Sequence, residues 1–215
     1  MSIRKVNLVN GEYYHIYNRG NSKQKIFHDK EDYLRFMSLL YSCNSENNFR
    51  IFGLDKEKST YDFERGEQIV FIGAYCLMPN HFHILLTQKE ENGISKFMQK
   101  VTTAYVMYYN KKYERTGSLF EGKFKSQHVA DDLYLKYLFS YIHLNPVKLI
   151  QKDWKEKGIK DKIQAKKYID NYFFSSYFEY QEKERIQNRI LNMEEFPRYF
   201  INKQASEKEI REWIK

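Results

Sequence analysis

Two histidines separated by a single apolar residue give this chain its clearest chemical signal. They are His81 and His83, within the segment Cys-Leu-Met-Pro-Asn-His-Phe-His-Ile-Leu-Leu at positions 76–86. Residues two apart in a β-strand point to the same face, so the two imidazoles project together while Phe82 faces the other way. Paired imidazoles can provide half of a metal site. The alternative is an ordinary pair of histidines on a solvated sheet face.

A second polar pair could complete such a site. It lies in the segment Leu-Phe-Ser-Tyr-Ile-His-Leu-Asn-Pro-Val-Lys at 138–148, where Tyr141 and Asn145 are four residues apart and so share a helical face. An Asn oxygen suits a hard divalent ion, and a Tyr beside it could act as a nucleophile. The following Pro146 disfavours a helical conformation of Asn145, so their alignment is approximate. The alternative is a core stripe that contains Tyr134, Tyr137 and Tyr141.

The elements that position these side chains follow from hydrophobic periodicity. Residues 69–77 read as a buried strand, a Pro-Asn turn follows, and 81–87 returns as the second arm of a hairpin. A helix over 133–144, capped by Asp131 or Asp132, carries the tyrosine. The histidines are therefore expected on a sheet and the tyrosine on a separate helix.

The rest of the first 150 residues alternates between strands and helices. We expect strands at 12–17 and 119–129, a possible strand at 49–54, helices at 29–44 and 92–113, and a loop at 55–68. Asn92 is a candidate cap for the second helix. This order predicts an α+β fold with helices on one face of an antiparallel sheet.

The chain changes character after Lys148. Residues 152–167 are rich in lysine, and 171–180 are rich in aromatic residues that could pack back on the core. Ser206 and Glu209 form a possible capping box for a short final helix. We therefore divide the chain into a candidate catalytic domain at 1–150, which contains the histidine and tyrosine motifs, and a basic, aromatic-containing, mostly helical C-terminal extension at 151–215.

Charge and aromatic content favour a nucleic-acid partner. Lys and Arg number 36 against 28 Asp and Glu, a net charge of +8, and aromatic residues make up 17% of the chain. Basic side chains follow phosphates and aromatic rings stack on unpaired bases. The candidate DNA-binding residues are Arg19, Lys23, Lys25, Lys123, Lys125, His128 and Lys148.

The cysteine content and hydropathy indicate a cytoplasmic protein. Only two cysteines are present and their spacing is not that of a disulfide framework. We find no signal-peptide pattern, and no apolar run is long enough to cross a membrane.

The ordered motifs resemble one known family. The segments at 76–86 and 141–148, together with Tyr-His-Ile-Tyr-Asn-Arg-Gly at 14–20, Gly-Ser-Leu-Phe-Glu-Gly-Lys-Phe-Lys at 117–125 and Phe-Ser-Ser-Tyr at 174–177, resemble the IS200-like tyrosine transposases. Among these, the chain looks most similar to the REP-associated tyrosine transposases of bacteria. The resemblance implies an HUH endonuclease with a ferredoxin-like fold that cuts single-stranded DNA.

The resemblance also implies roles for individual residues. His81 and His83 correspond to the metal-binding histidines and Tyr141 to the nucleophile. Asn145 corresponds to the third ligand, at a position where insertion-sequence relatives usually carry Gln. The implied reaction leaves a 5′-phosphotyrosine and a free 3′-hydroxyl, and Mg²⁺ or Mn²⁺ suits the ligands and the phosphate chemistry. His143 and Lys148 are candidates for assisting the phenol.

Several points stay open at this level. The resemblance implies hairpin DNA with a single-stranded flank as substrate, a nucleoid-associated location in a bacterial-type cytoplasm, and either a monomer or a homodimer. A non-mobilising HUH nickase and a catalytically idle protein that binds DNA hairpins are the alternative functions. The absence of a P-loop motif disfavours a large replication initiator.

Overall fold

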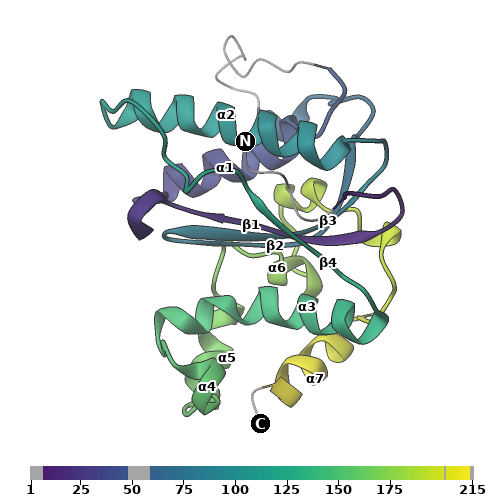
Figure 1. The fold of residues 1–215 in the computed structure, drawn as a ribbon. Helices are drawn as coiled ribbons and strands as arrows, with labels where there is room; N and C mark the ends of the chain where they lie inside the picture. Colours follow the sequence, from purple (N-terminus) through teal and green to yellow (C-terminus); the bar gives the residue numbers. More distant parts are fainter. Residues whose placement is uncertain (1–6, 48–58, 201, 214–215) are drawn as a thin grey trace.

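The centre of the fold is a four-stranded antiparallel sheet (Figure 1). The computed structural model describes residues 7–47, 59–200 and 202–213. The strands are β1 (Tyr13–Arg19), β2 (Val70–Met78), β3 (His81–Gln88) and β4 (Lys125–His128), in the order β2-β3-β1-β4. With a helix after β1 and another after β3, this is the ferredoxin-like arrangement, and the predicted α+β class and antiparallel sheet are confirmed.

Helices cover both faces of the sheet (Figure 1). They are α1 (Lys30–Ser42), α2 (Gly93–Lys112), α3 (Asp132–Leu144), α4 (Trp154–Lys157), α5 (Lys162–Asp170), α6 (Tyr177–Tyr180) and α7 (Lys203–Trp213). Short 3-10 turns occupy Asn21–Lys23, Thr60–Asp62, Asn145–Leu149, Ile186–Ile190 and Met193–Glu195. As expected, α1 and α2 share one face of the sheet, but α3 lies against the other face. The prediction of a single covered face was wrong because an amphipathic pattern does not reveal which face a helix will cover.

The side chains of β3 alternate as strand geometry requires. Phe82 packs on the α1 side, with its ring 5.1 Å from that of Phe36. His81 and His83 point to the side covered by α3, where the ring of His83 lies 5.5 Å from that of Tyr141. The histidine pair therefore lies on the face of the sheet opposite Phe82, between β3 and α3.

Three local predictions need correction. The strand expected at 119–129 is reduced to β4, because the chain before it is irregular and Gly122 adopts a φ of 67°. Asn92 precedes α2 in a left-handed conformation and its side chain caps nothing. Ser206 lies inside α7, whose first turn is capped instead by Asn202, which accepts from the Ala205 amide at 2.9 Å. The cap at Asp131 is confirmed.

The possible strand at 49–54 lies outside the described residues. The described part of the predicted loop, 59–68, contains one 3-10 turn. No helix in the described ranges is long and apolar enough to cross a bilayer.

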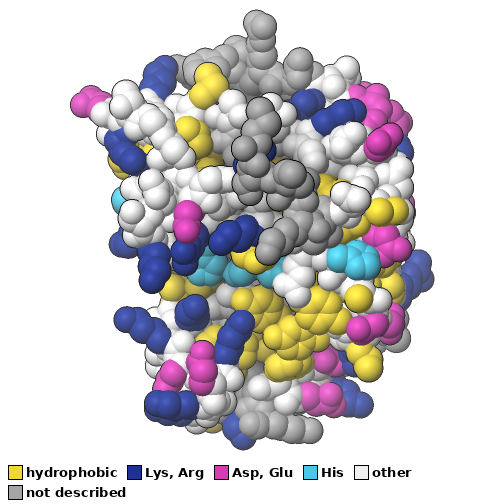
Figure 2. Space-filling model, in the orientation of Figure 1, with side chains coloured by type: hydrophobic (Ala, Val, Ile, Leu, Met, Phe, Trp, Pro, Cys, Tyr) yellow, Lys and Arg dark blue, Asp and Glu magenta, His cyan; other side chains and the backbone are white. Residues whose placement is uncertain are grey.

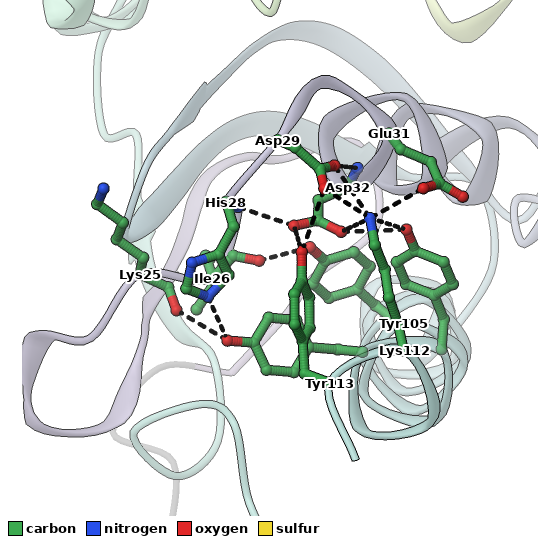
Figure 3. Close-up of polar contacts among 11 residues, drawn as sticks. Lys25, Ile26, His28, Asp29, Glu31, Asp32, Tyr105, Lys112 and Tyr113 are labelled. Atoms are coloured by element: carbon green, nitrogen blue, oxygen red, sulfur yellow. Dashed lines mark hydrogen bonds and ion pairs between the residues drawn. The ribbon is translucent and has the colours of Figure 1, made fainter. Parts of the chain in front are cut away.

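A buried carboxylate ties α1 to the end of α2 (Figure 3). Asp32, fully buried, accepts from the hydroxyls of Tyr113 at 2.7 Å and Tyr108 at 3.0 Å. Its third partner is the ammonium of Lys112 at 2.9 Å, and the backbone amide of His28 donates at 2.8 Å. Because every oxygen of this charge is satisfied, the loop after β1 is fixed relative to both helices.

A second buried charge joins the C-terminal segment to the sheet. Arg185 donates to both carboxylate oxygens of Glu179 at 2.7 and 2.8 Å, and to the Tyr75 hydroxyl of β2 at 3.0 Å. It also donates to the backbone oxygen of Ser175 at 2.8 Å. Burial raises the pKa of Glu179, although Arg185 opposes that shift. The segment after residue 150 therefore depends on β2 for its packing; the domain boundary at 150 stays a prediction.

Replacing Arg185 by Met should cost about 3–5 kcal/mol of unfolding free energy, because it leaves a buried carboxylate without its partner. The two side chains are only 7% and 2% exposed. Guanidinium denaturation measures the loss. Arg198, which is exposed, provides a control, and its replacement by Met should change stability by less than about 0.5 kcal/mol. Equal stability of the two variants would contradict this account.

Candidate active site

Three aromatic side chains converge where β1, β3 and α3 meet. The ring of Tyr141 lies 5.5 Å from that of His83 and 6.0 Å from that of His15, both in edge-to-face orientation. The rings of His81 and His83 are 5.0 Å apart. The predicted meeting of a histidine pair and a tyrosine from distant parts of the chain is therefore present. Figure 2 shows histidine side chains as a strip on this surface, bordered by Lys and Arg and by hydrophobic side chains.

Each histidine of the pair has one ring nitrogen held by a neighbour. Nδ1 of His81 lies 2.7 Å from Oδ1 of Asn80, and Nδ1 of His83 lies 2.8 Å from Nε2 of His15. The Asn80 oxygen can only accept, so Nδ1 of His81 carries the proton. When His83 likewise donates through Nδ1, both histidines keep a lone pair on Nε2.

Burial keeps these imidazoles uncharged. Burial, and then the charge of Lys148, lower the pKa of His81 to about 4, although a hydrogen bond with Asn145 opposes this. Burial, with a contribution from Lys155, lowers the pKa of His15 to about 4. Burial and the neighbouring histidines lower the pKa of His83 well below its usual range. Near neutral pH all three are neutral, which is the form that binds cations.

Asn145 reaches the histidine pair as expected. The helical path continues through it, with φ −51° and ψ −38°, because Pro146 occupies the first turn of a 3-10 segment rather than ending the helix abruptly. Its Nδ2 donates to the backbone oxygen of Tyr141 at 3.0 Å. That bond leaves the Asn145 oxygen as an electron-pair donor beside His81.

The donor set suits a hard divalent cation. With Nδ1 of His81 donating to Asn80, its other nitrogen keeps a lone pair, and the Asn145 oxygen also has lone pairs that could be given to a cation. A ligand histidine whose second nitrogen is held by a neighbour is also the usual arrangement in metal sites. Among the described residues no group of three or more His, Cys, Asp or Glu side chains could hold a metal ion. The predicted ligand set, His81, His83 and Asn145, contains only two residues of those four types, because its third ligand is an amide.

Positive charge surrounds the cluster. Lys148, Arg19 and Lys155 all act on His81 electrostatically, so each lies near the pair. The ammonium of Lys155 sits 3.7 Å from the centre of the Tyr141 ring. Arg19 is already paired with Glu121.

The other predicted DNA-binding residues are more dispersed. Strand register places Lys125 opposite Tyr17 and Tyr17 opposite His83, so a single row leads from Lys125 to the histidines. Lys123 and Lys125 line an open groove between α2 and the segment before β4. Lys23 lies close enough to Glu121 to lower the pKa of that carboxyl, after Arg19 and Lys125.

Two of the predicted residues lie away from this row. His128 pairs with Glu12 at 2.7 Å, and its register position opposite Tyr14 puts it on the face away from the histidine pair. Lys25 follows β1 beside the α1–α2 network (Figure 3).

His143, which was predicted as a candidate for assisting the Tyr141 phenol, does not face the cluster. His143 points into the core, where Nε2 contacts Oγ of Ser176 at 2.9 Å, and burial lowers its pKa to about 3. Sequence reasoning also missed His15 and Lys155. The alternation of β1 could have suggested His15, which is two residues from Tyr17; nothing local distinguishes Lys155 from its neighbouring lysines.

Fold and cluster together define a ferredoxin-like α+β protein with a histidine pair and a tyrosine on one face of its sheet. Residues 64–145 match the family model described as transposase IS200 like. That range contains His81, His83, Tyr141 and Asn145, so the chain is similar to this family over the segment that carries the cluster.

Two solved structures are similar at low identity. One is described as a REP-associated tyrosine transposase bound to a REP hairpin, with 13% identity, a TM-score of 0.49, and coverage of 87% of this chain and 90% of that one. The other is the tRNA(His) guanylyltransferase of Saccharomyces cerevisiae, with 11% identity, a TM-score of 0.37, and coverage of 93% and 86%. Likenesses of this degree do not define a function. No curated protein matches the chain.

Proposed function

We propose that this protein nicks single-stranded DNA at a hairpin and transfers the cut strand, with Tyr141 as nucleophile. The observation that carries the proposal is the position of the Tyr141 ring, 5.5 Å from His83 on the sheet. A phenol and a pair of neutral imidazoles on rigid elements can face a single phosphodiester.

The reaction follows from the residues. The Tyr141 oxygen attacks phosphorus, an O–P bond forms, and the P–O3′ bond breaks. The electron pair goes to the 3′ oxygen, which takes a proton, and the phenol loses its own. The product is a 5′-phosphotyrosine, and a second 3′-hydroxyl can attack it in the reverse sense without ATP.

His81, His83 and Asn145 would hold Mg²⁺ or Mn²⁺. Bound there, the ion would supply Lewis-acid stabilisation of charge on the phosphate. His15 orients His83 through Nδ1, and Asn80 orients His81 in the same way. Because these contacts fix the rings before substrate arrives, little reorganisation is needed.

The sequence motifs and the net charge support DNA as the substrate. The motif resemblance to REP-associated transposases suggests a hairpin with an unpaired flank, and the chain carries a net charge of +8. A protein with this activity belongs in the compartment that holds DNA, so we place it in a bacterial-type cytoplasm, as a monomer or a homodimer.

The decisive experiment looks for the covalent intermediate. The protein is incubated with labelled single-stranded hairpin DNA and Mn²⁺, and the products are separated in SDS. We expect a labelled adduct, with peptide mapping placing the DNA on Tyr141. Specific binding without an adduct would favour the idle hairpin-binding protein. An adduct that is never transferred to a second strand would favour the non-mobilising nickase.

The pair Lys123 and Lys125 should contact phosphates. Replacing both by Ala should weaken single-strand binding and reduce the slope of log K against log salt concentration by about 0.7 for each phosphate that is no longer neutralised, because fewer counterions are released. Titrations at several salt concentrations measure the slope. The matched control replaces Lys89 and Lys96, which are already paired with Glu67 and Glu90. A slope that falls equally in both double variants would contradict a specific role for Lys123 and Lys125.

A further inference from the structure

The ammonium group of Lys155 lies on the face of the Tyr141 ring. The distance from Nζ to the ring centre is 3.7 Å, well within the range of about 6 Å over which a cation is attracted to an aromatic face. Tyr137, one turn earlier on α3, stacks its ring parallel to Tyr141 with an interplanar angle of 6° and a centre-to-centre distance of 6.0 Å. The ring of Tyr141 is thus held by contacts from both α3 and α4.

The backbone that carries Lys155 is itself fixed. The preceding Trp154 is buried in the core. Gln151 closes the surrounding loop, since its Nε2 donates to the Gly158 oxygen at 2.8 Å and its Oε1 accepts from the Lys160 amide at 3.0 Å. The position of the lysine over Tyr141 therefore follows from the packing of α4.

The charge of Lys155 is not neutralised by a carboxylate within the described ranges, whereas Lys157 on the same helix pairs with Asp153 at 3.2 Å. Its influence extends over the whole cluster, since it helps to lower the pKa of His15, His81 and His83. Three neutral imidazoles and a phenol do not balance this charge. An anion brought to Tyr141 would.

We propose that Lys155 is a positioning residue for the reaction: it holds the Tyr141 ring toward the histidines and presents a positive charge to the phosphodiester that Tyr141 attacks. This inference rests on the proposed function. A fixed charge directed at a site where negative charge develops stabilises the transition state more than the ground state, because it needs no reorganisation. Lys155 should therefore affect the rate of adduct formation more than the affinity for DNA.

The test compares Lys155→Met, Lys155→Arg and Lys157→Met. Single-turnover formation of the covalent adduct should slow about a hundredfold in Lys155→Met, as expected when one preorganised donor is lost. Lys155→Arg, which keeps the charge, should recover most of the rate. Lys157→Met should react like the unaltered protein, and DNA affinity should change equally little in both Met variants. Thermal unfolding checks that each variant is folded.

A second measurement reports the contact without DNA. In the NMR spectrum, the ε-methylene protons of Lys155 should be shifted upfield by the Tyr141 ring current, and Tyr141→Leu should remove the shift. Absence of that shift overturns the inference. So does a Lys155→Met variant that forms adduct at the unaltered rate, or an equal loss of rate in Lys157→Met. An unaltered protein that forms no adduct overturns the proposed function instead, and with it the role of Lys155 in the reaction.

Discussion

Replacing Tyr141 by Phe should abolish the covalent DNA adduct while DNA affinity stays within about twofold of the original. The substitution removes only the hydroxyl, so the ring keeps its edge contacts with His83 and His15. No attacking oxygen remains, and loss of a nucleophile can cost about 10⁶ in rate. Adduct formation on labelled hairpin DNA, measured in SDS gels, and filter binding of the same DNA give the two quantities.

A neighbouring tyrosine provides the control. Tyr137→Phe removes a hydroxyl from the ring that stacks on Tyr141, and adduct formation should survive. If Tyr141→Phe still forms adduct at the original rate, another residue is the nucleophile. If it loses binding and adduct together, the effect is structural and the assignment of Tyr141 fails.

Replacing His81 by Gln should slow nicking about a thousandfold, because a bound divalent ion stabilises the transition state by several kcal/mol and each 1.36 kcal/mol is tenfold in rate. His15→Gln should cost only about ten- to a hundredfold, since His15 is not a ligand: it holds His83 by a hydrogen bond and meets Tyr141 only through a ring-edge contact. Initial rates over a range of Mn²⁺ concentrations measure both losses. A high Mn²⁺ concentration should restore more of the lost nicking rate in His15→Gln than in His81→Gln.

Removing the metal gives the complementary result. Treatment with EDTA should abolish nicking, and added Mg²⁺ or Mn²⁺ should restore it. Equal losses in His81→Gln and His15→Gln would contradict the assignment of His81 as a ligand and His15 as its neighbour's support.

The histidine pair could be predicted from the sequence because strand alternation depends only on adjacent residues. Because His81 and His83 are two positions apart in β3, their side chains share a face of the sheet whatever the rest of the chain does. Helical spacing is also a local rule, and it placed Asn145 one turn after Tyr141. The helices α1 and α2 were recognisable for a similar reason, since their 3-and-4 spacing of apolar residues is a property of a short window.

Features that depend on tertiary contact could not be predicted in this way. Whether α3 covers the same face as α1 is decided by chain connections, not by its amphipathic pattern. Lys155 meets Tyr141 because Trp154 is buried, and His15 meets His83 through strand pairing. The irregular path before β4 depends on a positive φ at Gly122, whose sequence context resembles an ordinary strand.

The cluster draws its members from four stretches of chain, with His15 and His83 separated by 68 positions and Lys155 following later still. Translation must therefore pass α4 before all of them can come together. A ribosome-bound nascent polypeptide that ends at Asn145 contains Tyr141, the proposed nucleophile, but lacks the lysine beside it. Under the proposed function, the protein would therefore reach its full rate of adduct formation only after α4 has been made and has docked beside α3.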